Sequence, residues 1–370
     1  MNSYYSIRSK VIRDILAYIC RMHEIEPTPR SITWYRTPLA SKDFKSLHEK
    51  SDLLGWLQTG GFLALLLLTG STAFYSSLHW PLGVTLLLII LHGTFMSFSL
   101  NAVHELGHNT VFRTRALNAF FEKFFDFFGW ANSESFNVSH TRHHRYTLHQ
   151  PDDLEVVLPA KVNLRNVFLF GIFNPHGLQW MHRRAWHTAR GKFQGEWDLK
   201  LFPPGSPENA ATVRRARLLL AGHGLIIAFA IYFHLWVLPF LTTFNSGIFG
   251  TWLQVLCNST QHIGLQDSVD DFRLCCRTIT LNPFLQFIYW HMNYHIEHHM
   301  FAAVPCYRLG KLHRLIKHDL PACPHGLVAT WKEITAIQEI QKTNPDYEYV
   351  AVLPNARPDG LQPDLVPVAS

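Results

Sequence analysis

The sequence has 370 residues, of which 48% are hydrophobic and 16% are charged, whereas a soluble domain usually carries about 25% charged residues. The apolar residues are gathered in blocks, which is typical of an integral membrane protein. The net charge of +6 fits a membrane protein with a basic cytosolic side. No run of basic residues with interleaved aromatic residues occurs, so we exclude a nucleic-acid-binding protein.

The first 50 residues are polar, and we interpret 1–50 as a cytosolic N-terminal segment. They contain no short apolar core followed by a small-residue cleavage site, so we expect no cleaved signal peptide. The six cysteines show no CxxC pair and no disulfide-framework spacing, which indicates reduced thiols. They are Cys20, Cys257, Cys275, Cys276, Cys306 and Cys323.

Two apolar segments, near residues 54–75 and 81–101, lie in a stretch without Lys or Arg between Lys50 and Arg113. Each is roughly 20 residues long, or about 30 Å as a helix, which is enough to cross a bilayer. The short SSLHWP turn between them predicts a helical hairpin. No proline interrupts residues 84–108, so we expect the second helix to continue beyond the membrane surface.

The segment between Arg113 and Arg217 is basic and rich in histidine and aromatic residues. Within it, residues 116–130 combine many Phe side chains with few charges and are predicted to form a helix in the membrane interface. A buried core helix is the alternative there. Residues 161–175 are a candidate for a second interfacial helix, and the PPGSP sequence at 203–207 predicts a loop.

A second stretch without Lys or Arg holds two more predicted spans, near 218–236 and 238–257, with a turn between His234 and Ser246. The Lys and Arg residues lie on the side of the N-terminus, the middle segment and the C-terminal part, while the two turns have none. The positive-inside rule therefore places both termini in the cytosol. A topology of two spans plus one long buried hairpin is the alternative.

The fold predicted from these elements is an all-α integral membrane protein, with four transmembrane helices in two hairpins under a cytosolic helical cap. The membrane domain would extend over residues 51–330, with the cap formed by residues 102–215 and 258–330. Residues 331–370 are polar and would form a cytosolic C-terminal tail.

Histidines recur at helical spacing in three motifs on the predicted cytosolic side. HELGH places two imidazoles four residues apart, and HTRHH and HIEHH each place three at i, i+3 and i+4, on one helix face. Eight imidazoles exceed the ligands of a single ion, so they predict a two-metal site with nitrogen ligands. These residues are His104, His108, His140, His143, His144, His295, His298 and His299.

His262 is a ninth candidate, because it follows the fourth apolar segment as HELGH follows the second. Asn258 lies one helical turn before it, on the same face. A satisfied histidine at a helix end is the alternative for His262. His291, one turn before HIEHH, is a candidate to support a ligand, with an ordinary polar helix position as the alternative.

Carboxylates commonly fix a ligand imidazole through its far ring nitrogen. The candidates for this role are Asp152, Asp153, Asp267 and Glu297. The histidines within or at the spans are interpreted as structural: His79, His92, His223 and His234. The tryptophans are expected to pack the cap or to lie in the interface rather than to contact substrate: Trp130, Trp180, Trp186 and Trp290.

Two other kinds of metal protein are disfavoured. HELGH matches the HExxH zinc-protease motif, with Glu105 as the general base, but this interpretation leaves HTRHH and HIEHH unexplained. A metal transporter needs polar ligands within its spans, whereas the histidine motifs lie beyond them. Two iron ions with O2, by contrast, can cleave an unactivated C–H bond, which no side chain can do alone.

HELGH, HTRHH, QHIG and NYHIEHH resemble the three histidine boxes and the extra histidine of the membrane fatty-acid desaturase/hydroxylase superfamily, over about residues 52–318. The resemblance implies two iron ions held in a cytosolic cap above a four-helix membrane stem. It implies iron ligands at the eight histidines named above and at His262, with Asn258 holding a ligand water. Front-end desaturases typically have Gln at the position of His295, so that subgroup is disfavoured.

The resemblance implies a fatty-acid or acyl-lipid desaturase that uses O2 to form a C=C bond in a long acyl chain. A hydroxylase of a lipid, a terpenoid or another apolar small molecule is the alternative, because substrate placement within about an ångström decides the outcome. The sequence has no HPGG haem motif, so we expect a separate electron donor of cytochrome b5 or ferredoxin type. The expected location is the endoplasmic reticulum membrane in a eukaryote or the plasma membrane in a bacterium.

Overall fold

The computed structural model describes residues 30–245 and 249–354, so Cys20 and most of the predicted N-terminal segment lie outside the described residues. The chain divides into two units, Met1–Thr33 and Trp34–Ser370. The described residues of the first unit, 30–33, have no regular secondary structure. In the second unit, the described residues form helices and isolated β-bridges without any strand, which confirms the predicted all-α class.

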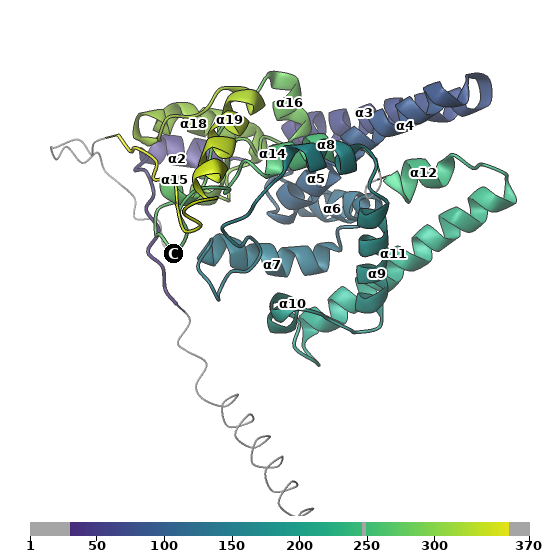
Figure 1. The fold of residues 1–370 in the computed structure, drawn as a ribbon, viewed down its shortest axis with the longest axis horizontal. Coiled ribbons are helices and arrows are strands. Elements are labelled where there is room, and N and C mark those ends of the chain that lie inside the picture. The colour runs from purple at the N-terminus through teal and green to yellow at the C-terminus, as the bar shows by residue number, and fades with distance from the viewer. Residues whose placement is uncertain (1–29, 246–248, 355–370) are drawn as a thin grey trace, which may run out of the picture. The chain divides into compact units, whose positions relative to one another are not determined.

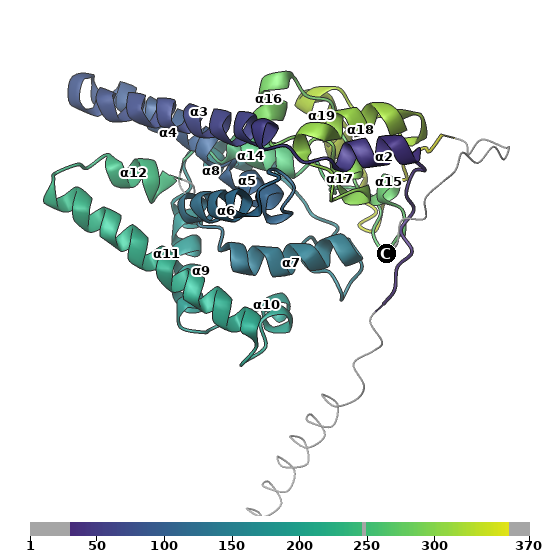
Figure 2. The ribbon, with the colours of Figure 1, turned by 180° about the vertical axis from the view of Figure 1, so that it is seen from behind.

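The first predicted hairpin consists of α3 (Asp52–His79) and α4 (Leu82–Met96), which run side by side in Figures 1 and 2. The Ser51 side chain begins α3 by accepting a hydrogen bond from the Leu54 N–H at 3.3 Å. Pro81, which has no N–H to donate, lies at the N-cap of α4. At 1.5 Å per residue the 28 residues of α3 span about 42 Å, which exceeds the thickness of a bilayer core.

The helix after the turn is interrupted before it reaches the first histidine motif. α4 ends at Met96 and α5 (Ser99–Gly107) begins three residues later. Between them the Ser97 hydroxyl donates to the Thr94 carbonyl at 2.9 Å, a local bond that competes with the helical ladder and bends helices. The helical path therefore continues to Gly107, as the sequence predicts, with a two-residue break at Ser97 and Phe98.

The second predicted hairpin is formed only in part by long helices. Residues 218–236 fall largely within α11 (Pro207–Tyr232), as expected. The segment 238–257 is not one continuous helix; its described residues contain the short helices α12 (Leu238–Thr242) and α14 (Trp252–Asn258).

The close packing of this segment against α4 explains the break. Gly250 has a φ of +74°, in the left-handed region that favours glycine, and a Cβ there would overlap the backbone of Thr94. A Cβ at Gly93 on α4 would likewise overlap the carbonyl of Phe249. The chain therefore crosses directly against α4 at two glycines, in a conformation that a helix cannot adopt.

Among the residues that the structure describes, three helical stretches are long and apolar enough to cross a membrane: Asp52–His79, Leu82–Gly107 (α4 and α5 together) and Pro207–Tyr232. Each exposes large aliphatic or aromatic side chains, which is unfavourable in water and favourable against lipid. Examples are Leu57, Leu67 and Leu68 on α3, Leu86 and Leu87 on α4, and Leu225, Phe229 and Ile231 on α11.

The remaining helices surround the histidine motifs. In the N-terminal half they are α2 (Ser41–His48), α6 (Arg115–Gly129), α7 (Ser133–Tyr146), α8 (Leu164–Ile172), α9 (Pro175–Ala189) and α10 (Glu196–Leu201). Later in the chain they are α15 (Phe272–Cys275), α16 (Pro283–Ile288), α17 (His295–Met300), α18 (Cys306–Ile316), the 3-10 helix η1 (Lys317–Asp319) and α19 (Gly326–Ile340). α6 and α8 confirm the two helices predicted within 116–130 and 161–175.

The aromatic core ties the hairpin to the histidine-bearing helices. Trp290, just before HIEHH, is fully buried, and its ring lies 5.7 Å from that of Phe62 on α3. The ring of Phe125 on α6 lies 6.0 Å from Trp290 on another side. α6 therefore buries one face, while Phe120 on its other face is 61% exposed.

Candidate metal centre

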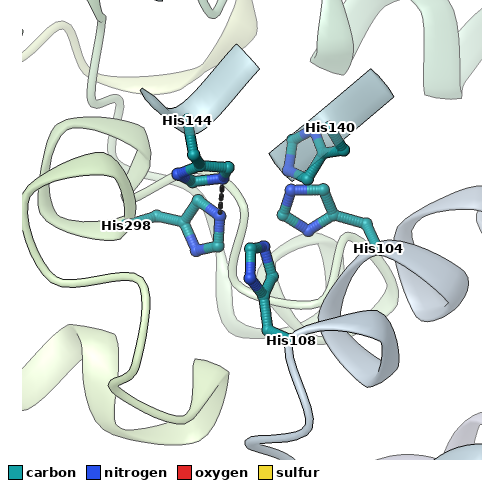
Figure 3. A group of neighbouring side chains, drawn as sticks. All are labelled: His104, His108, His140, His144 and His298. Carbon is teal, nitrogen blue, oxygen red and sulfur yellow. Dashed lines mark hydrogen bonds between the residues drawn. The ribbon is translucent and has the colours of Figure 1, made fainter. Parts of the chain in front are cut away.

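Five histidines from three parts of the chain meet in one cluster, which we call the first cluster (Figure 3). Two come from α5 and the residue after it, two from α7 and one from α17. Each offers a ring nitrogen within 4.8 Å of the corresponding nitrogen of the others. The five residues are His104, His108, His140, His144 and His298.

A second cluster forms beside it from buried residues of two further segments. The nitrogens of His262, His295 and His299 and the sulfur of Cys276 all lie within 4.8 Å of one another. The ring of His143 lies 5.2 Å from that of His262 and 5.0 Å from that of His299. His143 therefore adjoins the second cluster rather than the first, although it belongs to the same HTRHH motif as His140.

The two clusters are neighbours. The rings of His144 and His299 are stacked at 4.3 Å. Within the first cluster, the Nε2 atoms of His144 and His298 approach to 3.1 Å. The structure thus brings together all nine histidines that the sequence singled out, from segments that are up to 195 residues apart (104 to 299).

Many ring nitrogens in the clusters are buried without a hydrogen-bond partner, although buried polar atoms normally have one. A divalent metal would supply the missing partner, and neutral imidazole is a common metal ligand. The clusters therefore fit a pair of metal ions. The unpartnered atoms are His104 Nε2, His108 Nε2, His140 Nε2, His295 Nδ1, His298 Nδ1 and His299 Nε2.

Carboxylates hold the far nitrogens of the HTRHH imidazoles. Asp153 Oδ2 accepts from His143 Nδ1 at 2.7 Å, and Glu155 Oε1 accepts from His140 Nδ1 at 2.9 Å. A carboxylate in this position fixes the tautomer and the orientation of a ligand imidazole. Asp153 was among the predicted carboxylates, and the structure places it in that role.

Glu105 orients the first motif in the same way. Its Oε1 lies 3.0 Å from His104 Nδ1 and 3.5 Å from His298 Nδ1. This side chain is 1% exposed, so it is aimed into the site. Sequence reasoning considered Glu105 only as the base of a zinc protease, an interpretation that explains two of the five histidines of the first cluster.

Burial keeps the cluster imidazoles neutral, with a lone pair available to a metal. Burial lowers the pKa of His108 to about 4 and that of His262 to about 3. For His143, burial opposes the charged form, but the hydrogen bond to Asp153 and the nearby Glu155 raise its pKa overall. The same pairing lowers the pKa of Asp153 against the effect of its burial.

Two of the other predicted carboxylates have different partners. Asp152 pairs with Arg142 at 3.5 Å rather than with a cluster imidazole. Glu297 accepts from His313 Nδ1 at 2.5 Å. Glu297 is two residues from His295, about 200° around the helix, so its side chain leaves from the opposite face.

The remaining supporting candidates are also bonded elsewhere. The backbone N–H of Asp267 donates to Glu348 Oε1 at 3.3 Å, and His291 Nδ1 bonds to the Gln286 amide at 3.0 Å. Asn258 Oδ1 accepts from Asn101 Nδ2 at 3.1 Å, a bond that fixes the orientation of the Asn258 amide.

Glu155 is a site residue that sequence reasoning missed. It lies two residues after Asp153, in a segment without helix. In an extended chain, alternate residues point to the same side, so the D-x-E spacing was the signal available. The Ser139 hydroxyl donates to Glu155 Oε2 at 2.5 Å, and Trp197 Nε1 donates to Ser139 Oγ at 3.0 Å.

A cavity of about 490 Å³ reaches this hydrogen-bonded group. Its walls come from α6, α7, α9, α10 and α11 and include Trp130, Trp180 and Trp197. The cavity wall near the first cluster includes Phe136, whose ring stacks on His140 at 5.0 Å. Trp130 and Trp180 thus line this cavity, and Trp130 also stacks on the His223 ring at 4.1 Å, which confirms the packing role expected from the sequence for Trp130.

Two span histidines have structural partners, as expected. His92 bonds to the Thr69 hydroxyl at 2.9 Å and to the Leu241 carbonyl at 3.2 Å. His223 bonds to the Thr243 hydroxyl at 3.0 Å. Neither belongs to the two clusters.

Residues 78–331 match the family model described as fatty acid desaturase. This match covers more than half of the chain and includes all three histidine motifs and His262. No curated protein matches the chain.

Proposed function

Because the chain belongs to the fatty acid desaturase family, we propose that it is an O2-dependent membrane oxidoreductase that forms a C=C bond in the acyl chain of a lipid. The observation that carries this proposal is the convergence of nine histidines into two adjoining buried clusters. The clusters provide more nitrogen ligands than one ion accepts.

The proposed cofactor is a pair of iron ions, which together with O2 supplies the oxidising power to break an unactivated C–H bond. Burial favours the neutral imidazoles, and the carboxylates of Glu105, Asp153 and Glu155 fix the orientation of the rings. Asn258, oriented by Asn101, would hold a ligand water. The proposed iron ligands are His104, His108, His140, His143, His144, His262, His295, His298 and His299.

The cavity of about 490 Å³ is the proposed site of the substrate chain. Its lining is largely apolar, and ligand cavities of about 300–1,000 Å³ are typical for small molecules. The Trp197–Ser139–Glu155 bonds couple the cavity wall to His140. A carbon atom near Phe136 would therefore lie beside the first cluster, and the buried wall would exclude water from it.

A hydroxylase of a lipid, a terpenoid or another apolar small molecule is the second candidate. The tryptophans Trp130, Trp180 and Trp197 in the cavity wall accommodate a ring as well as an acyl chain. The same histidines serve both reactions, and the position of the reacting carbon selects between a second hydrogen loss and oxygen insertion.

The proposed topology has four spans with both termini in the cytosol, and the segment 238–257 would cross as α12 and α14 joined by a non-helical stretch. Non-helical backbone is tolerated at membrane depth where it is buried in protein, and the glycine contact with α4 supports this. The clusters would then lie on the basic, cytosolic side. The proposed location is the endoplasmic reticulum in a eukaryote and the plasma membrane in a bacterium.

The proposed partners are a long-chain lipid, O2 and a separate electron donor of cytochrome b5 or ferredoxin type. Two electrons are needed for each O2 molecule in addition to those taken from the substrate.

Expression in a desaturase-deficient host, followed by mass spectrometry of total lipids, tests the proposal. Lipids that lose two hydrogens support a desaturase, and products that gain one oxygen support a hydroxylase. A His140→Ala variant, present in the membrane at the same level, serves as the inactive control. Wild-type lipids identical to those of this control would contradict both candidate reactions.

A further inference from the structure

Cys276 lies among the histidines of the second cluster. Its sulfur is within 4.8 Å of a ring nitrogen of His262, His295 and His299, and the residue is 2% exposed. Sequence reasoning treated this cysteine as an ordinary reduced thiol, because no metal-binding cysteine spacing occurs. Its place beside HIEHH arises only when the chain folds.

The backbone fixes this position from both sides. The Cys276 N–H donates to the Phe272 carbonyl at 2.9 Å and closes α15, while the following Arg277 N–H donates to the Gln261 carbonyl at 2.7 Å. The Cys275 carbonyl bonds to His262 Nδ1 at 2.8 Å. One short segment therefore orients the His262 ring and presents the Cys276 sulfur to the same cluster.

The imidazoles beside Cys276 have ring nitrogens that are available to a metal ion. His299 Nε2 is buried without a hydrogen-bond partner, in a residue that is 3% exposed, and the Nε2 atoms of His262 and His295 face each other at 2.9 Å. Burying unpartnered polar atoms is unfavourable, and a metal ion would satisfy them. With His143, whose ring lies 5.0 Å from that of His299, the donors beside this space are four imidazoles and one thiol.

We propose that Cys276 is a sulfur ligand of the metal in the second cluster. The set would then be four histidines (His143, His262, His295 and His299) and one cysteine, whereas the first cluster would be all nitrogen. On binding, a sulfur–metal bond forms and the thiol proton passes to solvent, with no change in oxidation state. The inference deepens the proposed function and rests on it for the identity of the native metal.

A sulfur ligand makes the two metals unequal. Thiolate is a soft, negatively charged donor, and it is the one anionic donor among the five. In a buried site, a negative ligand offsets part of the charge of a divalent cation. The metal beside Cys276 would therefore be held more tightly than with the four histidines alone.

Co²⁺ is the probe for this ligand, because cobalt bound to thiolate has a sulfur-to-metal charge-transfer band in the near ultraviolet. The full-length protein, freed of metal and titrated with Co²⁺, is expected to bind two ions and to show this band. Cys276→Ser is expected to abolish the band and to weaken binding of one ion by about tenfold or more. Cys257→Ser, another fully buried cysteine outside the cluster, is the matched control and should keep both.

Several results would overturn the inference. Two Co²⁺ ions bound to the wild-type protein without a sulfur band would refute Cys276 as a ligand and leave the proposed function standing. The same conclusion would follow if the band persisted in Cys276→Ser. A wild-type protein that binds no Co²⁺ would overturn the metal centre and the proposed function together. The wild-type spectrum decides the question even if the serine variant does not fold.

Discussion

Replacing Asp153 by asparagine perturbs the support of a single imidazole, that of the proposed metal ligand His143. The Asp153 carboxylate is fully buried and accepts three hydrogen bonds. They come from His143 Nδ1 at 2.7 Å, from the Leu148 N–H at 2.8 Å and from the Glu155 N–H at 2.9 Å. Because all three partners are donors, the amide group of asparagine must face at least one of them with a donor of its own.

The cost follows from these contacts. The best orientation of the amide keeps its oxygen towards His143 and Leu148 and leaves the Glu155 N–H without an acceptor. The negative charge that strengthens the hydrogen bond to His143 is also lost. Removing a carboxylate behind a metal ligand typically lowers metal affinity or activity about 10–100-fold, which corresponds to about 1.4–2.8 kcal/mol. We expect a loss in this range for Asp153→Asn.

The assay is a metal titration of the full-length variant, paired with product formation in the desaturase-deficient host. Asp152→Asn is the matched control, because its carboxylate pairs with Arg142 and Lys200 at 3.5 Å near the surface. Exposed ion pairs of this kind contribute about 0–1 kcal/mol. Equal metal affinities for the two variants would refute the role assigned to Asp153.

Four further predictions concern stability, pH, metal removal and the cavity. Arg215→Met leaves the buried Asp126 without the guanidinium that lies 2.6 Å away, so we expect a loss of about 3 kcal/mol in thermal unfolding experiments; an unchanged midpoint would contradict this. Burial lowers the pKa of His108 from its usual 6.5 to about 4, so between these pH values the unfolded chain binds a proton that the folded chain does not. Metal-free protein should therefore lose stability as the pH falls from about 6.5 to about 4. A thermal unfolding midpoint that is independent of pH in this range would contradict the prediction. A chelator should lower the unfolding midpoint of the wild type more than that of His298→Ala, because a bound ion stabilises the fold by mass action and the variant has lost a ligand of the first cluster. Equal shifts would remove His298 from the site. Ala185→Phe fills part of the cavity, so turnover of the longest acyl chains should fall first while the iron content is unchanged; an unaltered product profile would place the chain elsewhere.

The histidine motifs could be recognised in the sequence from their local spacing. The i, i+3, i+4 spacing places imidazoles on one face, and the structure brings those faces together. His262 was predicted from its place after an apolar segment, and it lies in the second cluster. The division of the nine residues between two clusters depends on how α5, α7 and α17 pack. The sequence therefore could not show that His140 belongs to the first cluster while His143 adjoins the second.

Tertiary packing also decided the features that sequence reasoning missed. The segment 238–257 has the composition of a span, but the contact of Gly250 with α4 breaks it into α12 and α14. Cys276 reaches the second cluster through the fold of α15, and no spacing in the sequence connects it with HIEHH. Glu297 lies within the HIEHH motif, but its side chain leaves the opposite face of the helix and accepts a hydrogen bond from His313.

The iron content of full-length protein purified without added metal decides whether the clusters form a two-metal site. Two iron ions per chain are expected, and His144→Ala, which removes the ring stacked on His299 at the junction of the clusters, should retain fewer. A wild-type protein that holds a single zinc ion, or no iron under conditions in which its lipid products are formed, would contradict the di-iron site.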